Sequence, residues 1–429
     1  MYYLYFILIL LTNYLDSPLA LYTGDFGMSV LPLISILMFP YFVLSKKIKY
    51  IDRFIKKFWK LIKYTLFITL ISFLVLPICG ISLFQLGEFL PIKAIKVATI
   101  TTGYLCYLII ISNICIKLSV KQIFKPFYYG FIFITILTFI EYQQIPFAFQ
   151  QLHFSGLFPY YRIRLLTSES SATAPLIEIF FIFALYYSHY ILKNKLKTFL
   201  IIGCFLLQLL LSGSKTLLVA FTVGIIIANW EFIKSFFLRF SIKKFGILLF
   251  IIIGIHYCYL IFITPMIQSF TRDIEEFTSV ATRAYSVSIG YGIGTVFPCG
   301  IGFSSHLYLL PYAMEKYISL IPSILNTDEI ISYLTNGDDT ALTAKSMFGQ
   351  YSMYWGIFGS IYFLRQLLSL YKSAITHNSL QGKILFKVLL IINIIQLLFT
   401  ADMQYIVLSV IAVLISLKYH KTVSPNYIQ

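Results

Sequence analysis

The chain consists of long, continuously apolar runs separated by short polar segments. Most runs are about 17 to 25 residues long, the length of a helix that crosses a hydrocarbon core of roughly 30 Å. They lack the alternating apolar and polar positions of outer-membrane strands. We therefore predict about twelve membrane-spanning helices, at residues 2–15, 28–44, 61–83, 94–116, 124–140, 173–192, 199–211, 216–236, 245–264, 351–371, 384–399 and 402–417. Because two of these runs are short and the last two nearly adjoin, ten or eleven spans also agree with the pattern.

The composition narrows the class of protein. Hydrophobic residues make up 59% of the 429 residues, charged residues make up only 12%, and the mean hydropathy is +0.85. So low a charged fraction excludes a soluble globular protein, and so much apolar surface excludes intrinsic disorder. The predicted fold class is an all-α polytopic integral membrane protein with about 12 transmembrane helices and one large loop outside the cytoplasm.

The basic residues predict the orientation of these spans. Most of the 33 lysine and arginine residues fall in alternate short loops, and such loops stay in the cytoplasm. With both termini cytoplasmic, that side holds only two acidic residues, Asp52 and Glu231. The net charge of +16 is then a topology signal. The basic residues are too scattered to indicate a nucleic-acid partner.

Two segments outside the cytoplasm are too long to be simple connections, and long loops on a rigid scaffold commonly carry function. We expect three regions. Residues 1–264 form a bundle of about nine helices with an outside loop at 141–172, residues 265–350 form a large outside loop, and residues 351–421 form the C-terminal helices. The cytoplasmic loops lack a phosphate-binding Gly-x-x-x-x-Gly-Lys pattern, so a synthetic reaction outside would need a substrate that is already activated. The six cysteines show no metal-ligand spacing, and we expect no metal or cofactor.

The first long loop ends in a polar segment that leads into an apolar helix. It contains Arg162 and Arg164, which lie outside against the positive-inside trend. Ser168 or Ser171 is suited to cap the following helix, and Glu169 would then lie in its first turn, where the helix dipole favours an acidic residue. Capping alone would therefore explain Glu169, whereas the two arginines also suggest an anion site.

Two further basic elements are notable. Lys215 lies between two apolar runs with no room for a loop, and an ionisable group at such a place is a functional candidate unless it reaches the interface. Arg283 is followed by a glycine-rich stretch over residues 290–302. Glycines allow backbone N–H groups to approach an anion, but the same spacing also permits close helix packing.

In this order, the motifs resemble those of the Wzy-type polymerases of O-antigen and capsular polysaccharide repeat units, within the O-antigen ligase/polymerase superfamily. In that family an arginine and a short Ser/Glu-rich segment enter a span, as residues 164–171 do here. A Gly/Ser-Ser-Arg-Thr-like turn follows two spans later. Residues 213–216 match this turn, except that Lys215 stands where arginine is usual.

The resemblance continues through the large loop. In the family this loop opens with an arginine and contains a Pro-x-Gly-x-Gly element, here Arg283 and residues 298–302. Arg283 and Gly294 also match an Arg-x10-Gly pattern noted in some members. A Phe-Gly-Gln, Tyr and Gly-Ile-x-Gly signature then enters the next span at residues 348–359. Each motif is short, and their order and placement carry the resemblance.

The resemblance implies a GT-C-like membrane glycosyltransferase in the bacterial inner membrane with a periplasmic active face. Its substrate would be an oligosaccharide on undecaprenyl pyrophosphate. The growing glycan would be transferred to a new lipid-linked repeat unit, and undecaprenyl pyrophosphate would leave. Membrane lipid and a polysaccharide chain-length regulator are the further partners that the family suggests.

A leaving group that departs with negative charge requires fixed cations. Arg283 and Arg164 are the preferred catalytic cations because a guanidinium can bind two phosphate oxygens at once. Glu169 is the first candidate for a base that deprotonates the acceptor hydroxyl, with Asp273, Glu275 and Glu276 as alternatives and Asp338 and Asp339 ranked after them. No base is needed if loss of the leaving group runs ahead of attack. The remaining pyrophosphate-binding candidates are Arg162, Lys215, Gly294, Gly300 and Gly302, and the glycan-binding candidates are Tyr285, Tyr291, His306, Asp338 and Asp339.

Two other functions remain open from the sequence. The sister O-antigen ligases carry a functional histidine in their large loop and transfer glycan to lipid A core, but the residues around His306 do not resemble that context. A lipid-linked oligosaccharide flippase would place charges along many spans that line a cavity. Because the spans here are nearly free of charge and one outside loop is long, polymerase is the favoured function.

Overall fold

The computed structural model of the chain describes residues 1–154, 160–212, 214–231, 234, 278–320, 327–336, 343–375, 382–399 and 404–423. Within this part, the regular secondary structure is helical apart from one antiparallel hairpin, β1 (Phe84–Gln85) and β2 (Glu88–Phe89), in which Phe84 pairs with Phe89. The all-α membrane class is therefore confirmed. The number of spans and the GT-C-like arrangement stay predictions. The predicted span at residues 245–264 lies outside the described residues.

Five helical segments in the described part are long and apolar enough to cross a membrane. They are α4 (Arg53–Ile78), α5 (Leu90–Cys115), α6 (Val120–Gln144), α7 (Ser170–Tyr186) continued by η3 (Tyr187–Ile191), and α8 (Lys195–Ser212). Shorter apolar helices accompany them, among them α1 (Tyr2–Leu11), α3 (Leu31–Leu44), α9 (Lys215–Ala228) and α18 (Tyr405–Val423). The short elements of the N-terminal half are α2 (Ala20–Thr23), η1 (Gly24–Gly27) and η2 (Gln150–Leu152).

Helix α7 lies in the centre of the bundle, and its packing fixes the position of its N-terminus. Its apolar side chains are buried on all sides, and Phe183 packs against two phenylalanines of α6 with ring centroids 5.3 and 4.5 Å apart. Gly130 of α6 leaves room for Phe180, because a Cβ there would lie 2.2 Å from the Phe180 ring. The close α6–α7 contact therefore depends on a small residue, as in many membrane helix pairs.

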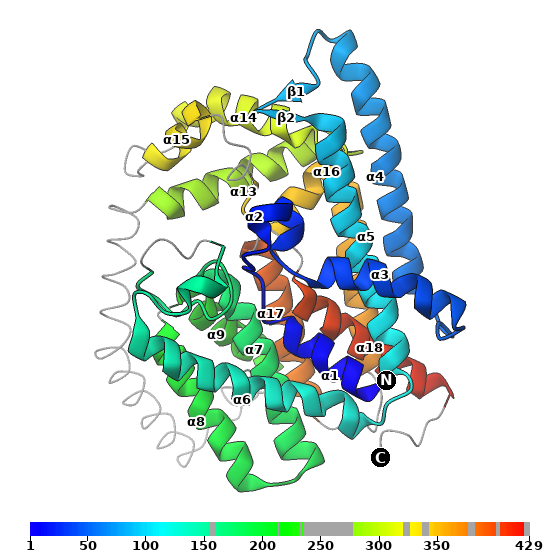
Figure 1. Cartoon of the computed structure of the whole chain (residues 1–429), viewed down its shortest axis with the longest axis vertical. Helices are drawn as coiled ribbons and strands as arrows, with labels where there is room; N and C mark the ends of the chain where they lie inside the picture. The colour runs from blue at the N-terminus through cyan, green and yellow to red at the C-terminus, as the bar shows by residue number, and fades with distance from the viewer. Residues whose placement is uncertain are drawn as a thin grey trace.

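The large loop contributes helices of its own. They are α13 (Thr278–Val296), α14 (His306–Tyr317), η5 (Ile318–Leu320) and α15 (Asp328–Asn336). The three α-helices gather near the β1–β2 hairpin at one end of the molecule (Figure 1). Leu307 of α14 joins an apolar cluster with Leu76 and Leu90 from the adjacent ends of α4 and α5. This cluster ties the large loop to the membrane-spanning helices.

Helix α13 packs along α16 (Met347–Ile375), which is followed by α17 (Lys383–Phe399). The glycines of α13 make the approach close, since a Cβ at Gly290 would lie 2.8 Å from Ala344 and one at Gly294 would lie 2.7 Å from the carbonyl oxygen of Ser352. Of the two interpretations that the glycine spacing left open, close packing is the one that these contacts show. This packing sets the position of Arg283 near the start of α13.

The Pro-x-Gly-x-Gly element and the Gly-Ile-x-Gly signature pack against each other. The backbone of Gly356 has a φ of +73°, which interrupts α16, and a Cβ there would collide with the Pro298 carbonyl. The N–H of Ile301 donates to the Met353 carbonyl at 2.8 Å. Only glycine adopts such a φ freely at a contact this close. Two motifs far apart in the sequence thus form one structural unit.

Candidate functional site

Glu169 and Arg283 connect the two long segments that the sequence places outside the cytoplasm. One terminal guanidinium nitrogen of Arg283 lies 3.0 and 2.9 Å from the two carboxylate oxygens of Glu169, and it donates to the Ser171 hydroxyl at 3.3 Å. The two charged side chains are 34% and 48% exposed. This ion pair joins the N-terminus of α7 to α13 and remains open to solvent.

The side chain of Glu169 is available for this pair because it does not cap the helix. Helix α7 begins at Ser170, so Glu169 is the N-cap residue and not a first-turn residue as expected, and its carboxylate accepts no helix N–H. The N–H of Ser170 donates instead to the hydroxyl of Tyr160 at 2.8 Å. An aromatic residue ten positions earlier therefore supplies the cap that the sequence assigned to Ser168 or Ser171.

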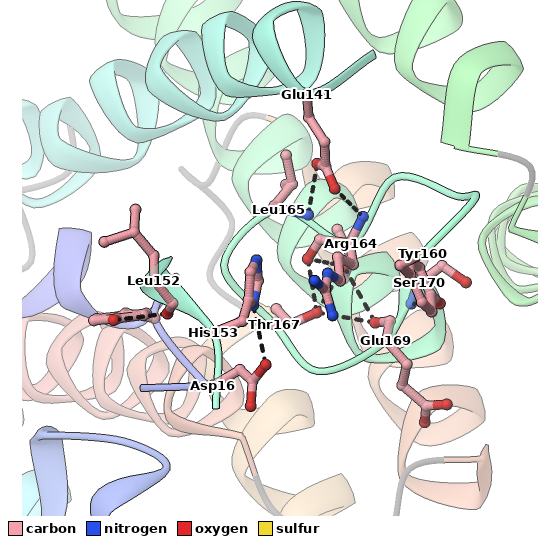
Figure 2. A network of polar contacts seen from close by, with 12 residues as sticks. Asp16, Glu141, Leu152, His153, Tyr160, Arg164, Leu165, Thr167, Glu169 and Ser170 are labelled. Atoms are coloured by element: carbon pink, nitrogen blue, oxygen red, sulfur yellow. Dashed lines mark hydrogen bonds and ion pairs between the residues drawn. The ribbon is translucent and has the colours of Figure 1, made fainter. Parts of the chain in front are cut away.

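Arg164 is 2% exposed and anchors the turn before α7. Its guanidinium carbon lies 5.0 Å from the centroid of the Tyr160 ring, within cation–π distance. Its carbonyl oxygen accepts from the hydroxyls of Thr167 and Thr173 at 2.9 and 2.8 Å. Figure 2 shows Arg164, Thr167 and Glu169 together, and the Thr167 hydroxyl also lies 2.9 Å from the backbone carbonyl oxygen of Glu169.

A second carboxylate holds the backbone of the same turn. Glu141, near the end of α6, is 1% exposed, and its two oxygens accept the N–H groups of Arg164 and Leu165, each at 2.8 Å (Figure 2). Leu165 has a φ of +52°, in the left-handed region that branched side chains rarely adopt. Two consecutive N–H groups aimed at one carboxylate form an anion-binding nest.

The N-terminal segment of the chain closes this region. Asp16 Oδ2 and His153 Nδ1 lie 3.0 Å apart, and both side chains are fully buried. The N–H of Leu15 donates to the carbonyl of Leu166 at 2.9 Å, and that of Phe154 to the carbonyl of Asp16 at 3.1 Å. Figure 2 shows Asp16 and His153 beside the turn of Arg164. The turn is therefore supported by contacts from three segments distant in sequence.

The arrangement has a clear electrostatic character. The N-terminus of α7 carries partial positive charge. Arg164 is buried in the turn that precedes it, Arg283 contacts Glu169 and Ser171 at its start, and Arg162 is exposed nearby in the sequence. Within the part of the chain that the structure describes, Glu169 is the acidic group that pairs with Arg283. Such a site can bind an anion through the guanidinium of Arg283 and present a carboxylate beside it.

The predicted glycan-binding residues of the large loop lie in several environments. The hydroxyl of Tyr285 donates to the Met314 carbonyl at 2.6 Å, and burial raises the pKa of Tyr285 to about 12. Burial also raises the pKa of Tyr291, opposed by a hydrogen bond with Ser346. His306 is buried against the Tyr354 ring, and burial together with nearby Lys93 lowers the pKa of His306 to about 3. His306 is therefore neutral at physiological pH.

The remaining predicted residues divide into two groups. Gly294, Gly300 and Gly302 are described, and a Cβ at any of them would meet protein atoms within 2.8 Å, so packing accounts for these glycines without a ligand. Their role in pyrophosphate binding stays a prediction. The side chain of Lys215 lies outside the described residues, as do the alternative bases Asp273, Glu275 and Glu276 and the pair Asp338 and Asp339. Among the described residues, no group of three or more His, Cys, Asp and Glu side chains could hold a metal ion.

Sequence reasoning missed four residues of this site. Glu141 is the first residue of the predicted outside loop at 141–172, and its position directly after an apolar run is the one signal in the sequence that points to it. Tyr160, Asp16 and His153 carry no such signal, because their roles depend on contacts between segments that are distant in sequence.

These features define a multi-pass helical membrane protein with a charged cluster at the N-terminus of a central helix. No family model matches the chain, and no solved structure gives a significant match. The chain is similar to an uncharacterized 49.5 kDa protein in the cps region of Klebsiella pneumoniae, with 26% identity over 262 residues. The match covers 51% of this chain and 61% of the relative, so the chain spans less than two thirds of that relative's length.

Proposed function

We propose that the protein polymerises lipid-linked oligosaccharide repeat units into a surface polysaccharide at the outer face of the bacterial inner membrane. The donor is a glycan on undecaprenyl pyrophosphate, and the acceptor is a hydroxyl of a new lipid-linked repeat unit. The observation that carries the proposal is the contact between Glu169 and Arg283. It brings a carboxylate and a guanidinium from two distant outside segments to one helix N-terminus.

The two charged groups divide the chemistry between them. The acceptor oxygen forms a bond to the anomeric carbon, and the bond from that carbon to the pyrophosphate oxygen breaks with its electron pair. Arg283 stabilises the charge that develops on the pyrophosphate. Glu169 takes the proton of the acceptor hydroxyl.

The solvent exposure of the Glu169–Arg283 ion pair suggests how the lipid-linked donor binds. An ion pair between side chains that are 34% and 48% exposed is held weakly, and a pyrophosphate carries more negative charge than one carboxylate. The donor headgroup therefore displaces Glu169 from Arg283. The freed carboxylate is then available to the acceptor. Binding of the leaving group and release of the base are in this way one event.

Contacts within the structure support the proposed sidedness. Lys418 Nζ lies 2.7 Å from Asp52 Oδ2, and both residues belong to segments that the basic-residue pattern assigns to the cytoplasm. Glu169 and Arg283 both belong to segments assigned to the outside. Because each contact joins segments of one predicted side, the arrangement agrees with a site on the outer face.

The comparison with known proteins supports a role in the synthesis of capsular polysaccharide. The similar Klebsiella pneumoniae protein is described as lying in a cps region, a designation for capsule genes. A polysaccharide assembled from lipid-linked repeat units is what a capsule polymerase makes. We therefore place the proposed activity in capsular polysaccharide biosynthesis.

Deletion of the gene in its host tests the function directly. Surface and lipid-linked glycans are extracted and separated on a gel that resolves single repeat units. We expect the polymer ladder to disappear while single repeats remain. Loss of every repeat, including the first, would indicate a ligase or a flippase and would overturn the proposal.

Complementation of the deletion strain with variants of Arg283 tests the role assigned to its contact with Glu169. Arg283→Ala should reduce the polymer at least about 100-fold at normal protein abundance, because a fixed cation is lost at the leaving group. Arg283→Lys should restore part of the ladder, since it keeps the charge but not the fork. Lys316→Ala, an exposed basic residue in the same large loop, is the matched control and should leave the ladder intact. A full ladder with Arg283→Ala would contradict the assigned role.

A further inference from the structure

The strongest unexplained feature near the site is the buried carboxylate of Glu141. A carboxylate taken out of water is costly unless hydrogen bonds replace its hydration. At 1% exposure, Glu141 has two such bonds, each 2.8 Å long and each from a backbone N–H group. Neither donor is a side chain, so the bonds do not depend on which side chains occupy positions 164 and 165. The carboxylate acts on the path of the backbone.

That path is strained where the carboxylate contacts it. Leu165 has a φ of +52°, and holding a branched residue in the left-handed region costs of the order of 1 kcal/mol or more. The left-handed residue is what turns two successive N–H groups to the same side. The two hydrogen bonds from Glu141 therefore stabilise a turn that the local sequence does not favour.

The strained turn is connected to the ion pair by a continuous set of hydrogen bonds. The Arg164 carbonyl accepts from the hydroxyls of Thr167 and Thr173, and these hydroxyls lie 2.8 Å apart. The Thr167 hydroxyl also lies 2.9 Å from the Glu169 carbonyl oxygen, directly at the N-cap of α7. A shift of the turn at Arg164 therefore moves the residue whose carboxylate meets Arg283.

We propose that Glu141 is a positioning residue that holds the turn of Arg164 and thereby places the Glu169 carboxylate for proton transfer. The proposal rests on the proposed function for its catalytic part. Arg283 lies on α13, outside this network apart from its contacts with Glu169 and Ser171. Loss of Glu141 therefore disturbs the base and leaves the position of the cation to α13 and α16.

Hydrogen exchange and kinetics of Glu141→Gln test the proposal in the full-length protein. The amide keeps the size of the side chain but offers one acceptor in place of two. We expect faster exchange at the backbone amides of Arg164 and Leu165. We also expect kcat, per folded molecule, to fall about 10- to 100-fold, with the KM for a lipid-pyrophosphate-linked repeat unit nearly unchanged. If Glu141→Gln does not fold, Glu141→Asp, which keeps the charge but shortens the reach, gives the same readouts.

Glu178→Gln is the matched control. Glu178 is also a buried carboxyl group, at 0% exposure in α7, but it accepts from Gln396 of α17 and not from the turn. It should lower the yield of folded protein and leave kcat per folded molecule unchanged. An unchanged kcat in Glu141→Gln, with faster exchange at Arg164 and Leu165, would reduce Glu141 to a structural residue and overturn the proposal. Unchanged exchange would overturn it independently of activity, because that measurement needs no substrate.

Discussion

Two glutamates of the candidate site lie in opposite environments. Glu169 is about half exposed and meets the guanidinium of Arg283, whereas Glu141 is buried and meets only backbone N–H groups among its hydrogen-bond partners described above. An exposed ion pair contributes less than about 1 kcal/mol and exchanges readily. A buried carboxylate with both oxygens bonded is expensive to disturb. From this difference we infer that the Glu169 carboxylate can exchange its partner, whereas the Glu141 carboxylate keeps its two N–H donors.

Of the changes that distinguish the two glutamates, replacement of Glu169 is expected to have the largest effect on activity. Glu169→Gln removes the proton acceptor, and general-base catalysis is worth about 100-fold or more, so kcat should fall by that order. The same change removes the anion that competes for Arg283, so the lipid-linked donor should bind as well or more tightly. Steady-state kinetics with a defined donor measure both effects.

The control for this variant is Glu315→Gln, which changes an exposed carboxylate on α14 of the large loop. It should leave both constants as they are. A normal kcat in Glu169→Gln would show that no base acts at this position, and weaker donor binding would show that the carboxylate does not compete with the headgroup for Arg283.

The sequence predicts that the membrane-spanning helices exist, but it does not predict exactly where each one begins. Apolar length predicts α4, α5 and α6 because it reflects the membrane itself, but it places the start of α4 too late. The helix begins at Arg53, where the carboxylate of Asp52 accepts the Phe54 N–H at 2.8 Å, and it continues through lysines that an apolar run does not include. Capping chemistry, not hydropathy, sets that boundary.

The residues of the candidate site likewise divide into those that the sequence predicts and those that it does not. Arg283 and Glu169 stand out in the sequence because they are charged residues in outside segments that match ordered motifs. Glu141, Asp16 and His153 do not, since the first binds backbone amides and the other two bind each other across most of the N-terminal half of the chain. No local pattern encodes a partner that only the packed bundle brings near. The glycines of α13 are intermediate, because their spacing is visible but packing and anion binding predict the same spacing.

The buried side chain of His306 leads to a prediction about how the stability of the protein depends on pH. His306 has a pKa of about 3 in the folded protein, below the ordinary value near 6.5, because burial disfavours the charged ring. Between these two values the unfolded chain binds a proton that the folded protein does not. Stability should therefore fall as the pH drops from 6.5 toward 3, by at most about 1.4 kcal/mol per pH unit from this one group.

Thermal melting in detergent at pH 7, 6 and 5 measures this dependence. His306→Phe keeps an aromatic ring beside Tyr354 and removes the titrating group, so its melting temperature should fall less steeply with acid than that of the wild type. His189→Phe is the control, because its ring lies elsewhere, against Tyr190. Equal slopes for the wild type and His306→Phe would mean that the folded protein protonates His306 in this range.

The smallest effect is expected at Tyr160, which contacts both the buried Arg164 and the first turn of α7. Tyr160→Phe keeps the ring beside Arg164 and removes the hydroxyl that accepts the Ser170 N–H, so stability should fall by about 1 kcal/mol. Because that hydroxyl fixes the first turn of α7, kcat should also fall a few-fold as the Glu169 carboxylate becomes less well placed. Tyr161→Phe, at the neighbouring and 74% exposed position, is the control for losing a phenol. If the two variants melt and turn over alike, the hydroxyl of Tyr160 does not hold the helix N-terminus, and the placement of Glu169 depends on the Glu141 turn alone.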